Sequence, residues 1–596
     1  MMRLKHKIKR VIFRDLYTYI MENQVGFKQI RKELNDWMLA DLVDITNEFV
    51  KRQRIPDSCF IKRMNKAFDT MDFQTLLKKW VSIYYYDLLC ILDNAAFSKI
   101  SPRKPLVLID MPLNRFIYGK YFRKFNISPE IKWLKQPALF SRLATVLWEI
   151  SRTLYGSLSS GIRFSRRKKQ YKVMRESIMG LSSPSYDEAR NAGFYWGGVY
   201  FCDDFLIDEN KIKTQDVLFF TRANPHDCQR LKAYGDIKRS AYQHFDLKKL
   251  AIGIDIFFLR VIPKYLFSGS LALLHSLSSA DFLLFSNIFH NFTSSALPYE
   301  KVFSNYKVGV ELGHNYFSFH HIPEAIICRA YGTKYYFFQL SDNTVLENKL
   351  ILAFLSCDKL LVWGKDHVFG VECEAAKIFS IGYVFKEFIH RVSSEKSEFL
   401  SRMGISAKNK VVTFFDEAFG TTCIMTDANF VTFWETILEI ASRHKDTAVI
   451  IREKLPDAYL RLPEDLKRSF LNAKARLEKA ENVHILDSRN WSFIEAIGVA
   501  DIVITQGMTS SATIAVVSGI NGLYLDQAGF SHPFSRLYKN KLFFDDPAVL
   551  MDAVDRIIAD KESPISDIPE NIMRGLDEYP DDRAINLLRD TILDAA

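Results

Sequence analysis

The stretch Val499–Asp526 reads VADIVITQGMTSSATIAVVSGINGLYLD, and its signals follow the order strand, turn, helix, strand. The apolar run 502–504 is typical of a buried parallel strand, and the Gly and hydroxyl residues at 507–511 favour a turn and a helix start. We expect the helix to cover about 511–518, because Gly519 follows it, and a second buried strand to begin at Leu523. The stretch therefore predicts one compact β-α-β unit.

The turn after the first strand of such a unit lies at the carboxyl edge of the sheet. The free N–H groups and the positive dipole end of the following helix favour a phosphate there. Thr509, Ser510 and Ser511 would add hydroxyl groups. The same residues could simply cap the helix. A phosphate site is therefore favoured only if the neighbouring strands place charged side chains at the same edge of the sheet.

Two strands predicted upstream end in charged residues. The apolar stretch 411–415 leads into Asp416 and Glu417, and the stretch 448–451 leads into Arg452 and then Lys454. The other elements expected here are helices at 430–444, 463–479 and 492–499 and a strand at 482–486. This repeated alternation indicates an α/β fold with a doubly wound parallel sheet, in which the strand ends share one edge.

Four segments carry a resemblance to a known family: VTFFDEAFG (412–420), AVIIREKLP (448–456), NVHILDSRNW (482–491) and KLFFDDPAVLMDAV (541–554), with the opening stretch between the last two. In this order they resemble the C-terminal half of GT-B glycosyltransferases, particularly bacterial enzymes that build capsule or lipopolysaccharide. CDKLLVWG (357–364) and IGYV (381–384) resemble the end of the N-terminal domain of those enzymes, so the resemblance covers about residues 300–560.

The resemblance implies two Rossmann-like domains facing a cleft, the second of which holds the nucleotide of an activated sugar. The residues it places on the donor phosphates are Gly507, Thr509, Ser510, Ser511, Arg452 and Lys454. Ile514 stands where many relatives carry a Glu that binds the ribose hydroxyls. A non-catalytic scaffold in glycan assembly therefore remains an alternative.

The stretch HHIPEA (320–325) is the best candidate for catalysis in the first half. A His at neutral pH suits a general base on an acceptor hydroxyl, which favours His320 or His321, with Glu324 as a third candidate. The alternative is that these residues only steer the following helix, because Pro323 fits its first turn. His314, just upstream of this stretch, is a fourth candidate, and competing bases at other strand ends are Asp110, Asp416 and Glu417.

We expect no metal cofactor. The His residues at 314, 320 and 321 have no matching carboxylate or Cys spacing, and no D-x-D motif stands at a strand end. The charge of the leaving nucleotide would then be neutralised by Arg452, Lys454 and the helix start at Ser510.

Composition and charge limit the compartment and the partners that we expect for the protein. The chain is 48% hydrophobic and 25% charged, and its 8 Cys form no C-x-x-C pair, which favours reduced thiols in a cytosolic protein. No stretch has the uninterrupted apolar length of a membrane span. Lys and Arg cluster in residues 1–14 and 163–175, which indicates solvated faces or contact with an anionic membrane surface. No nucleic-acid-binding signature supports nucleic acid as a partner.

The chain divides into four expected parts: a helical extension (1–99), a first Rossmann-like acceptor domain (100–395) with an insertion near 127–192, a nucleotide-sugar domain (405–560) and a helical tail (561–596). Strands of the first domain are expected at 106–109, 196–201, 217–221, 252–257, 307–310, 334–338 and 359–363. The C-terminal helix at 582–593 would pack back on the first domain.

The function that follows is sugar transfer from a nucleotide-sugar donor to a growing glycan or glycolipid, in the cytoplasm or at the inner face of a bacterial membrane. Two enzymes of similar architecture remain as alternatives. One transfers glycerol phosphate from a cytidine donor, and the other is a UDP-sugar 2-epimerase.

Overall fold

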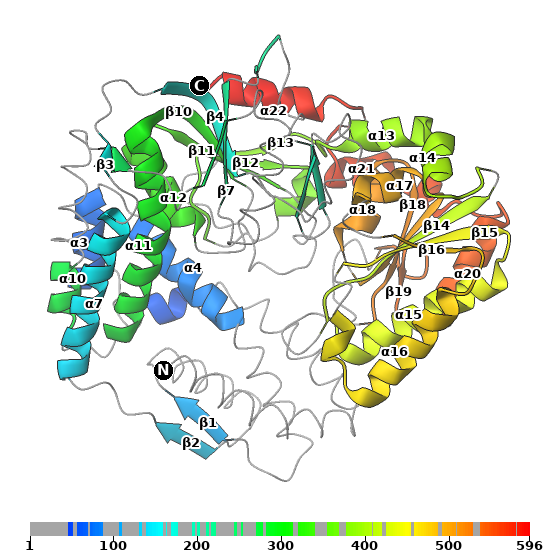
Figure 1. Cartoon of the computed structure of the whole chain (residues 1–596), viewed down its shortest axis with the longest axis horizontal. Helices are drawn as coiled ribbons and strands as arrows, with labels where there is room; N and C mark the ends of the chain where they lie inside the picture. The colour runs from blue at the N-terminus through cyan, green and yellow to red at the C-terminus, as the bar shows by residue number, and fades with distance from the viewer. Residues whose placement is uncertain are drawn as a thin grey trace.

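The computed structural model describes residues 44, 46–51, 57–68, 72–86, 106–109, 130–133, 139–158, 162–163, 169–176, 193–196, 199–202, 210–213, 216–221, 243–246, 252–253, 270–277, 282–313, 320–339, 354–368, 377–407, 409–419, 425–454, 458–486, 491–507, 509–527, 537–579 and 581–595. Two parallel sheets with flanking helices give the chain the α/β architecture that the sequence predicts (Figure 1).

The second domain is built on a parallel sheet of six strands in the order β16-β15-β14-β17-β18-β19. Its strands are β14 (Lys410–Phe415), β15 (Thr447–Arg452), β16 (Val483–Leu486), β17 (Ile502–Gln506), β18 (Asn521–Leu525) and β19 (Phe543–Phe544). All residues of β15 and β17 are buried, as their continuous apolar sequences require when helices cover both faces. The predicted strands of this domain are confirmed to within about two residues.

Helices cover both faces of this sheet. They are α15 (Asp427–Arg443), α16 (Glu464–Leu477), α17 (Phe493–Gly498), α18 (Ser510–Val517) and α20 (Pro547–Ile558). The contacts group α15 with α16 and α20, and α17 with α18, and Figure 1 shows the two groups on opposite sides of the sheet. Ser492 and Glu495 form a reciprocal capping box at the start of α17, which fixes where that helix begins.

The first domain is built on a sheet of seven strands in the order β13-β12-β11-β10-β4-β7-β8, again with parallel pairing. Its strands are β4 (Lys169–Glu176), β7 (Val217–Thr221), β8 (Gln243–Asp246), β10 (Tyr306–Gly313), β11 (Lys334–Phe338), β12 (Lys359–Val362) and β13 (Lys377–Ser380). Strand β4 lies in the middle of this sheet, between β10 and β7. The prediction of an insertion near 127–192 is therefore wrong for at least residues 169–176.

Three other predicted strands of this half also differ. The strand β1 (Leu106–Ile109) pairs with β2 (Glu130–Trp133) in a separate sheet, not with the seven strands. The expected strand at 196–201 is replaced by an antiparallel pair, β5 (Gly193–Trp196) and β6 (Val199–Cys202). Strand β9 is shorter than expected, at Ile252–Gly253, and pairs with β3 (Ile162–Arg163).

Helices cover the first sheet on the side of the N-terminal extension. The helices α11 (Phe282–Asn305) and α12 (His321–Ala330) pack on it, and α3 (Cys59–Phe68) and α4 (Asp72–Tyr86) pack on them in turn. Phe60 stacks on Phe285 with ring centroids 4.8 Å apart, and Phe73 lies 4.7 Å from Phe292. The described part of the extension is thus helical, as predicted. Among the residues that the structure describes, no helix has the length and apolarity needed to cross a bilayer.

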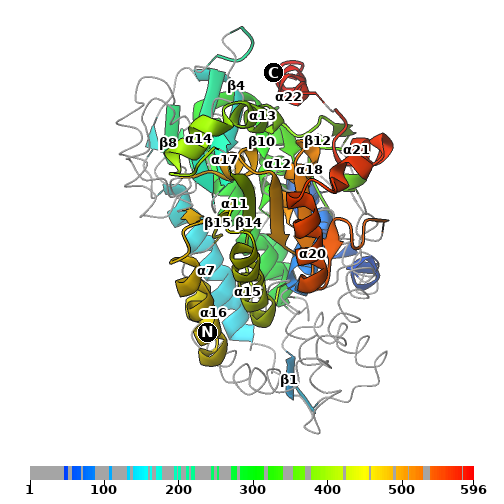
Figure 2. The same ribbon diagram turned by 90° about the vertical axis from the view of Figure 1, so that its right-hand side faces the viewer.

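The chain returns to the first domain at its C-terminal end. The helix α21 (Glu570–Leu576) contacts the short helix η6 (Lys365–Val368), and α22 (Ala584–Leu593) lies against β4, as Figures 1 and 2 show at the top of the molecule. Lys211 Nζ lies 2.6 Å from Asp590 Oδ1. The prediction that the C-terminal helix packs back on the first domain is confirmed.

Candidate functional site

Charged and polar side chains gather where β14, β15 and β17 end. Because β14 pairs in parallel with both neighbours, Asp416, Lys454 and Gln506 come to the same edge of the sheet. The backbone N–H of Lys454 donates to Asp416 Oδ1 at 2.5 Å, and that of Glu417 donates to Gln506 Oε1 at 3.1 Å. We call Asp416, Glu417, Glu453, Lys454 and Gln506 the strand-end cluster.

Asp416 has a strongly perturbed pKa. Its side chain is buried, and burial raises its pKa from 3.8 to about 7. The carboxylates of Glu453 and Glu417 act in the same direction, while the N–H and the ammonium group of Lys454 oppose them. A carboxyl group with this pKa exchanges a proton readily near neutral pH, which is what a general acid or base requires.

The two cations expected at the donor phosphates have protein partners. Lys454 Nζ pairs with Glu417 Oε1, which also accepts from the N–H of Ala418 at 2.7 Å. Arg452 is buried, and its Nε donates to the carbonyl oxygen of Trp491 at 3.3 Å. A bound phosphate would therefore have to share Lys454 with Glu417.

The turn into α18 has the geometry that the sequence predicts. Gly507 has a φ of +68°, a backbone conformation that favours Gly, and a Cβ atom there would require the flexible end of the Met425 side chain to move. Thr505 Oγ1 donates to the carbonyl oxygen of Gly507 at 3.1 Å and holds the turn. Ser510 and Ser511 occupy the first turn of α18 and are partly exposed.

Two buried polar atoms stand beside this helix start. Thr509 occupies the N-cap position, but its side chain makes no capping bond. Its Oγ1 and the Nε2 of Gln506 have no hydrogen-bond partner among the residues that the structure describes. Burying such groups unpaired costs free energy, so both are suited to a ligand that supplies the missing bonds.

The candidates of the first domain lie on α12. His320 stands at its N-cap position, where Ser295 Oγ lies 2.5 Å from its Nδ1. His321 and Glu324 are 1% and 3% exposed. Glu324 accepts a hydrogen bond from Tyr335 at 3.1 Å, and His321 packs edge-on against Phe337. Of the three, only His320 is not fully buried, and whether any of them is catalytic stays a prediction.

Sequence reasoning did not assign two members of the strand-end cluster, Gln506 and Glu453, or one buried carboxylate of the first domain, Glu311. Gln506 ends β17 and Glu453 directly follows Arg452 at the end of β15, and a polar residue at the end of a largely apolar strand was the available signal. Glu311 is buried in β10, where Tyr299 Oη donates to it at 2.5 Å and Cys328 Sγ lies 3.0 Å away. Burial and this carboxylate raise the pKa of the Cys328 thiol.

Some of the sequence predictions fall on residues that the structure does not describe. Asp110, His314 and residues 1–14 lie outside the described residues. Trp363 is 1% exposed and belongs to the core. Trp491 is partly buried, and the guanidinium of Arg402 lies 5.2 Å from its ring.

Comparison with known proteins gives only distant similarity. No family model matches the sequence, and no curated protein matches it. Among solved structures, the wall teichoic acid polymerase TagF is 10% identical with a TM-score of 0.39 and covers 77% of this chain and 97% of its own. An α,α-trehalose 6-phosphate synthase from Burkholderia multivorans is 12% identical with a TM-score of 0.37 and covers 72% and 98%. Values of this size assign neither a family nor an activity.

Proposed function

We propose that this chain is a GT-B-type glycosyltransferase that moves a sugar from a nucleotide-sugar donor to a growing bacterial surface glycan, of the capsule or lipopolysaccharide kind. One observation carries the proposal. The strand-end cluster, in which Glu417 N donates to Gln506 Oε1, and the start of α18, which follows β17 through the turn at Gly507, lie at one edge of the second sheet. In doubly wound sheets, that edge is where nucleotides bind.

The donor phosphates would bind at the first turn of α18. Ser510, Ser511 and the unpartnered Oγ1 of Thr509 offer hydroxyl groups there, next to N–H groups that have no partner inside the helix. Gly507, with its φ of +68°, lets the backbone turn from β17 into this helix start. Lys454 and Arg452 would supply positive charge as the nucleotide leaves.

Asp416 would act as the general base on the acceptor hydroxyl. A carboxylate with an ordinary pKa binds a proton too weakly for efficient transfer at neutral pH, whereas a pKa of about 7 matches the task. His320 would face the acceptor from the first domain, with the buried side chains of His321 and Glu324 behind it. Glu417 would orient Lys454 through their ion pair.

Donor turnover tests this function. The full chain is incubated with nucleotide-sugars and with CDP-glycerol, together with detergent-extracted bacterial glycolipids, and the released nucleotide is identified by ion-exchange chromatography. Release of a nucleoside diphosphate from one nucleotide-sugar is expected. Asp416→Asn should lower the rate by about 10²- to 10⁴-fold, the usual contribution of a general base.

The other outcomes separate the alternatives. Release of CMP from CDP-glycerol would indicate glycerol phosphate transfer. Conversion of a free UDP-sugar without an acceptor would indicate an epimerase. If no donor is consumed, the glycosyltransferase proposal fails and a scaffold is favoured.

A further inference from the structure

A group of large apolar side chains is exposed on the helical side of the first domain. They lie on α7 (Leu139–Leu158) and α10 (Ser270–His275), which contact each other and α11. The exposed fractions are 39% for Leu143, 57% for Leu147, 65% for Trp148, 40% for Leu271 and 36% for Leu274. Figure 1 shows α7 and α10 side by side, away from the second domain. We call these five residues the apolar face.

The apolar face follows from helix geometry. Leu143, Leu147 and Trp148 recur at the spacing that puts side chains on one side of a helix. Val146 and Glu149 point to the opposite side and are buried. Because the inward side already packs on the domain, this face is a second apolar side of the helix. Contiguous exposed apolar patches of this kind mark protein or membrane contacts.

The surroundings of the apolar face are cationic. The neighbouring helix α3 contacts α10 and carries Lys62, Arg63 and Lys66 but no acid. Arg63 Nη2 donates to Nε2 of His275, 3.3 Å away at the end of α10. Arg142 of α7 donates to the carbonyl oxygen of Leu277 at 2.6 Å. These contacts hold two cations, Arg63 and Arg142, at the C-terminal end of α10.

The helices that carry or border the apolar face contain few acidic residues. The sequences of α7, α10 and α3 contain one acidic residue, Glu149, whose side chain is 5% exposed and pairs with His290 at 2.8 Å. Asp57 precedes α3 and lies 3.2 Å from Lys62. The exposed Leu and Trp side chains of the face are therefore bordered by residues of net positive charge, on α3 and at Arg142.

We propose that the apolar face docks on the surface of an anionic lipid bilayer, with Leu147 and Trp148 inserted at headgroup depth and Arg63 and Lys66 on lipid phosphates. Trp is favoured at this depth because its ring is largely apolar and its N–H can stay hydrated. A basic, apolar helical surface binds membranes through both apolar burial and attraction to anionic lipids.

A second copy of the chain fits this face less well. A symmetric dimer places the same surface on both partners, so the positive margins would meet each other. An anionic bilayer neutralises the same margin. The inference rests on this surface alone and not on the donor site, although a lipid-linked acceptor would lie near a bilayer held in this way.

Vesicle flotation of the full chain tests the proposal. The vesicles contain either phosphatidylcholine alone or equal parts of phosphatidylcholine and phosphatidylglycerol. The wild type is expected to float with the anionic vesicles. Leu147→Ser with Trp148→Ser should lower the partition coefficient by roughly tenfold or more, because two apolar side chains are lost from the contact. Arg63→Gln with Lys66→Gln should lower it by roughly twentyfold at low salt.

A matched control changes exposed Leu residues elsewhere. Leu460 and Leu537 of the second domain are 60% and 64% exposed, and Leu460→Ser with Leu537→Ser should leave flotation unchanged. Circular dichroism melting shows whether each variant is folded.

Three results would overturn the proposal. The wild type could fail to float with anionic vesicles. It could float equally well after Leu147→Ser with Trp148→Ser, which would assign binding to another segment such as the basic residues 1–14. Finally, sedimentation could reveal a dimer that this double variant dissociates while no vesicle binding occurs.

Discussion

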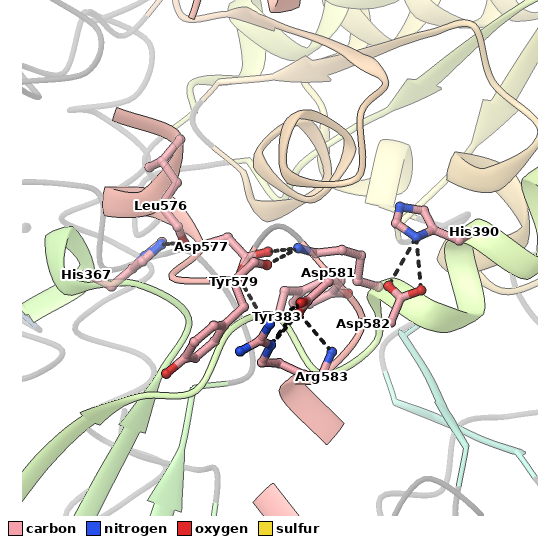
Figure 3. Close-up of polar contacts among 10 residues, drawn as sticks. His367, Tyr383, His390, Leu576, Asp577, Tyr579, Asp581, Asp582 and Arg583 are labelled. Atoms are coloured by element: carbon pink, nitrogen blue, oxygen red, sulfur yellow. Dashed lines mark hydrogen bonds and ion pairs between the residues drawn. The ribbon is translucent and has the colours of Figure 1, made fainter. Parts of the chain in front are cut away.

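Lys386 Nζ and Asp577 Oδ2 form an ion pair whose side chains are only 2% and 3% exposed. Lys386 begins α13 (Lys386–Ser394), which leads from the first sheet toward the second, and Asp577 directly follows α21. Lys386 Nζ also donates to the carbonyl oxygen of Tyr579 at 2.5 Å, and the N–H of Tyr383 donates to Asp577 Oδ1 at 3.1 Å (Figure 3). The C-terminal segment is thereby fixed to the connection between the domains.

Removing one partner of this pair should destabilise the protein strongly. Lys386→Ala leaves a buried carboxylate without its counter-ion, and we expect a loss of about 3–5 kcal/mol in the free energy of unfolding. Urea unfolding followed by circular dichroism measures it. The matched control is Arg574→Ala, which breaks the exposed Arg574–Glu570 pair and should cost at most about 0.5 kcal/mol. Equal losses in both variants would refute the structural role of the buried pair.

The raised pKa of Asp416 makes stability depend on pH. The folded protein binds this proton up to about pH 7, whereas an unfolded chain releases it near pH 3.8. The folded state is therefore favoured most below pH 3.8, and this contribution is lost as pH rises through about 7. At about 1.36 kcal/mol per pH unit, the difference between 3.8 and 7 corresponds to about 4 kcal/mol.

Asp416→Asn should remove this dependence, because the amide stays neutral while its oxygen can still accept from Lys454 N. We expect the variant to become more stable than the wild type as pH rises from about 4 to about 8. Urea unfolding of both proteins at several pH values measures the difference. An unchanged difference across this range would mean that Asp416 has an ordinary pKa.

Two Gly residues of the opening stretch allow a paired test of the turn into α18. Gly507→Ala should cost about 2–3 kcal/mol, because a strained backbone is combined with the displacement of the flexible end of Met425. Gly519 has a φ of +79°, and apart from its chain neighbours no heavy atom of the described residues lies within 4 Å of the place that a Cβ would take, so Gly519→Ala should cost only about 1–2 kcal/mol. Thermal unfolding compares the two. A smaller loss for Gly507→Ala would show that the turn can relax around a side chain.

The second domain could be predicted from the sequence because its signals are local. The strands β14, β15 and β17 are apolar runs buried on both faces, and Gly507 and Gly519 mark the ends of elements. The first domain could be predicted less well. The sequence of β4, KQYKVMRE, resembles a basic surface run, although its Tyr171 and Met174 are buried in the middle of a sheet.

Contacts between distant residues could not be predicted from local patterns. The bond from Glu417 to Gln506 joins strands 89 positions apart, and the bond from Tyr383 to Asp577 spans 194 positions. Both depend on the order of strands or on the path of the C-terminal segment, which periodicity does not encode. The elevated pKa of Asp416 has the same origin, because burial and the neighbouring Glu453 produce it.

Nucleotide binding at the start of α18 is the central claim, and thermal stability against CMP, CDP, UDP and GDP tests it most directly. The proteins compared are the wild type, Ser510→Ala with Ser511→Ala, and the control Ser563→Ala with Ser566→Ala at η8 (Pro564–Asp567). One nucleotide at about 100 times its Kd should add about 2.7 kcal/mol to the wild type and the control, and much less to the first variant. No stabilisation by any of them at millimolar concentration, or equal stabilisation of all three proteins, would contradict the account.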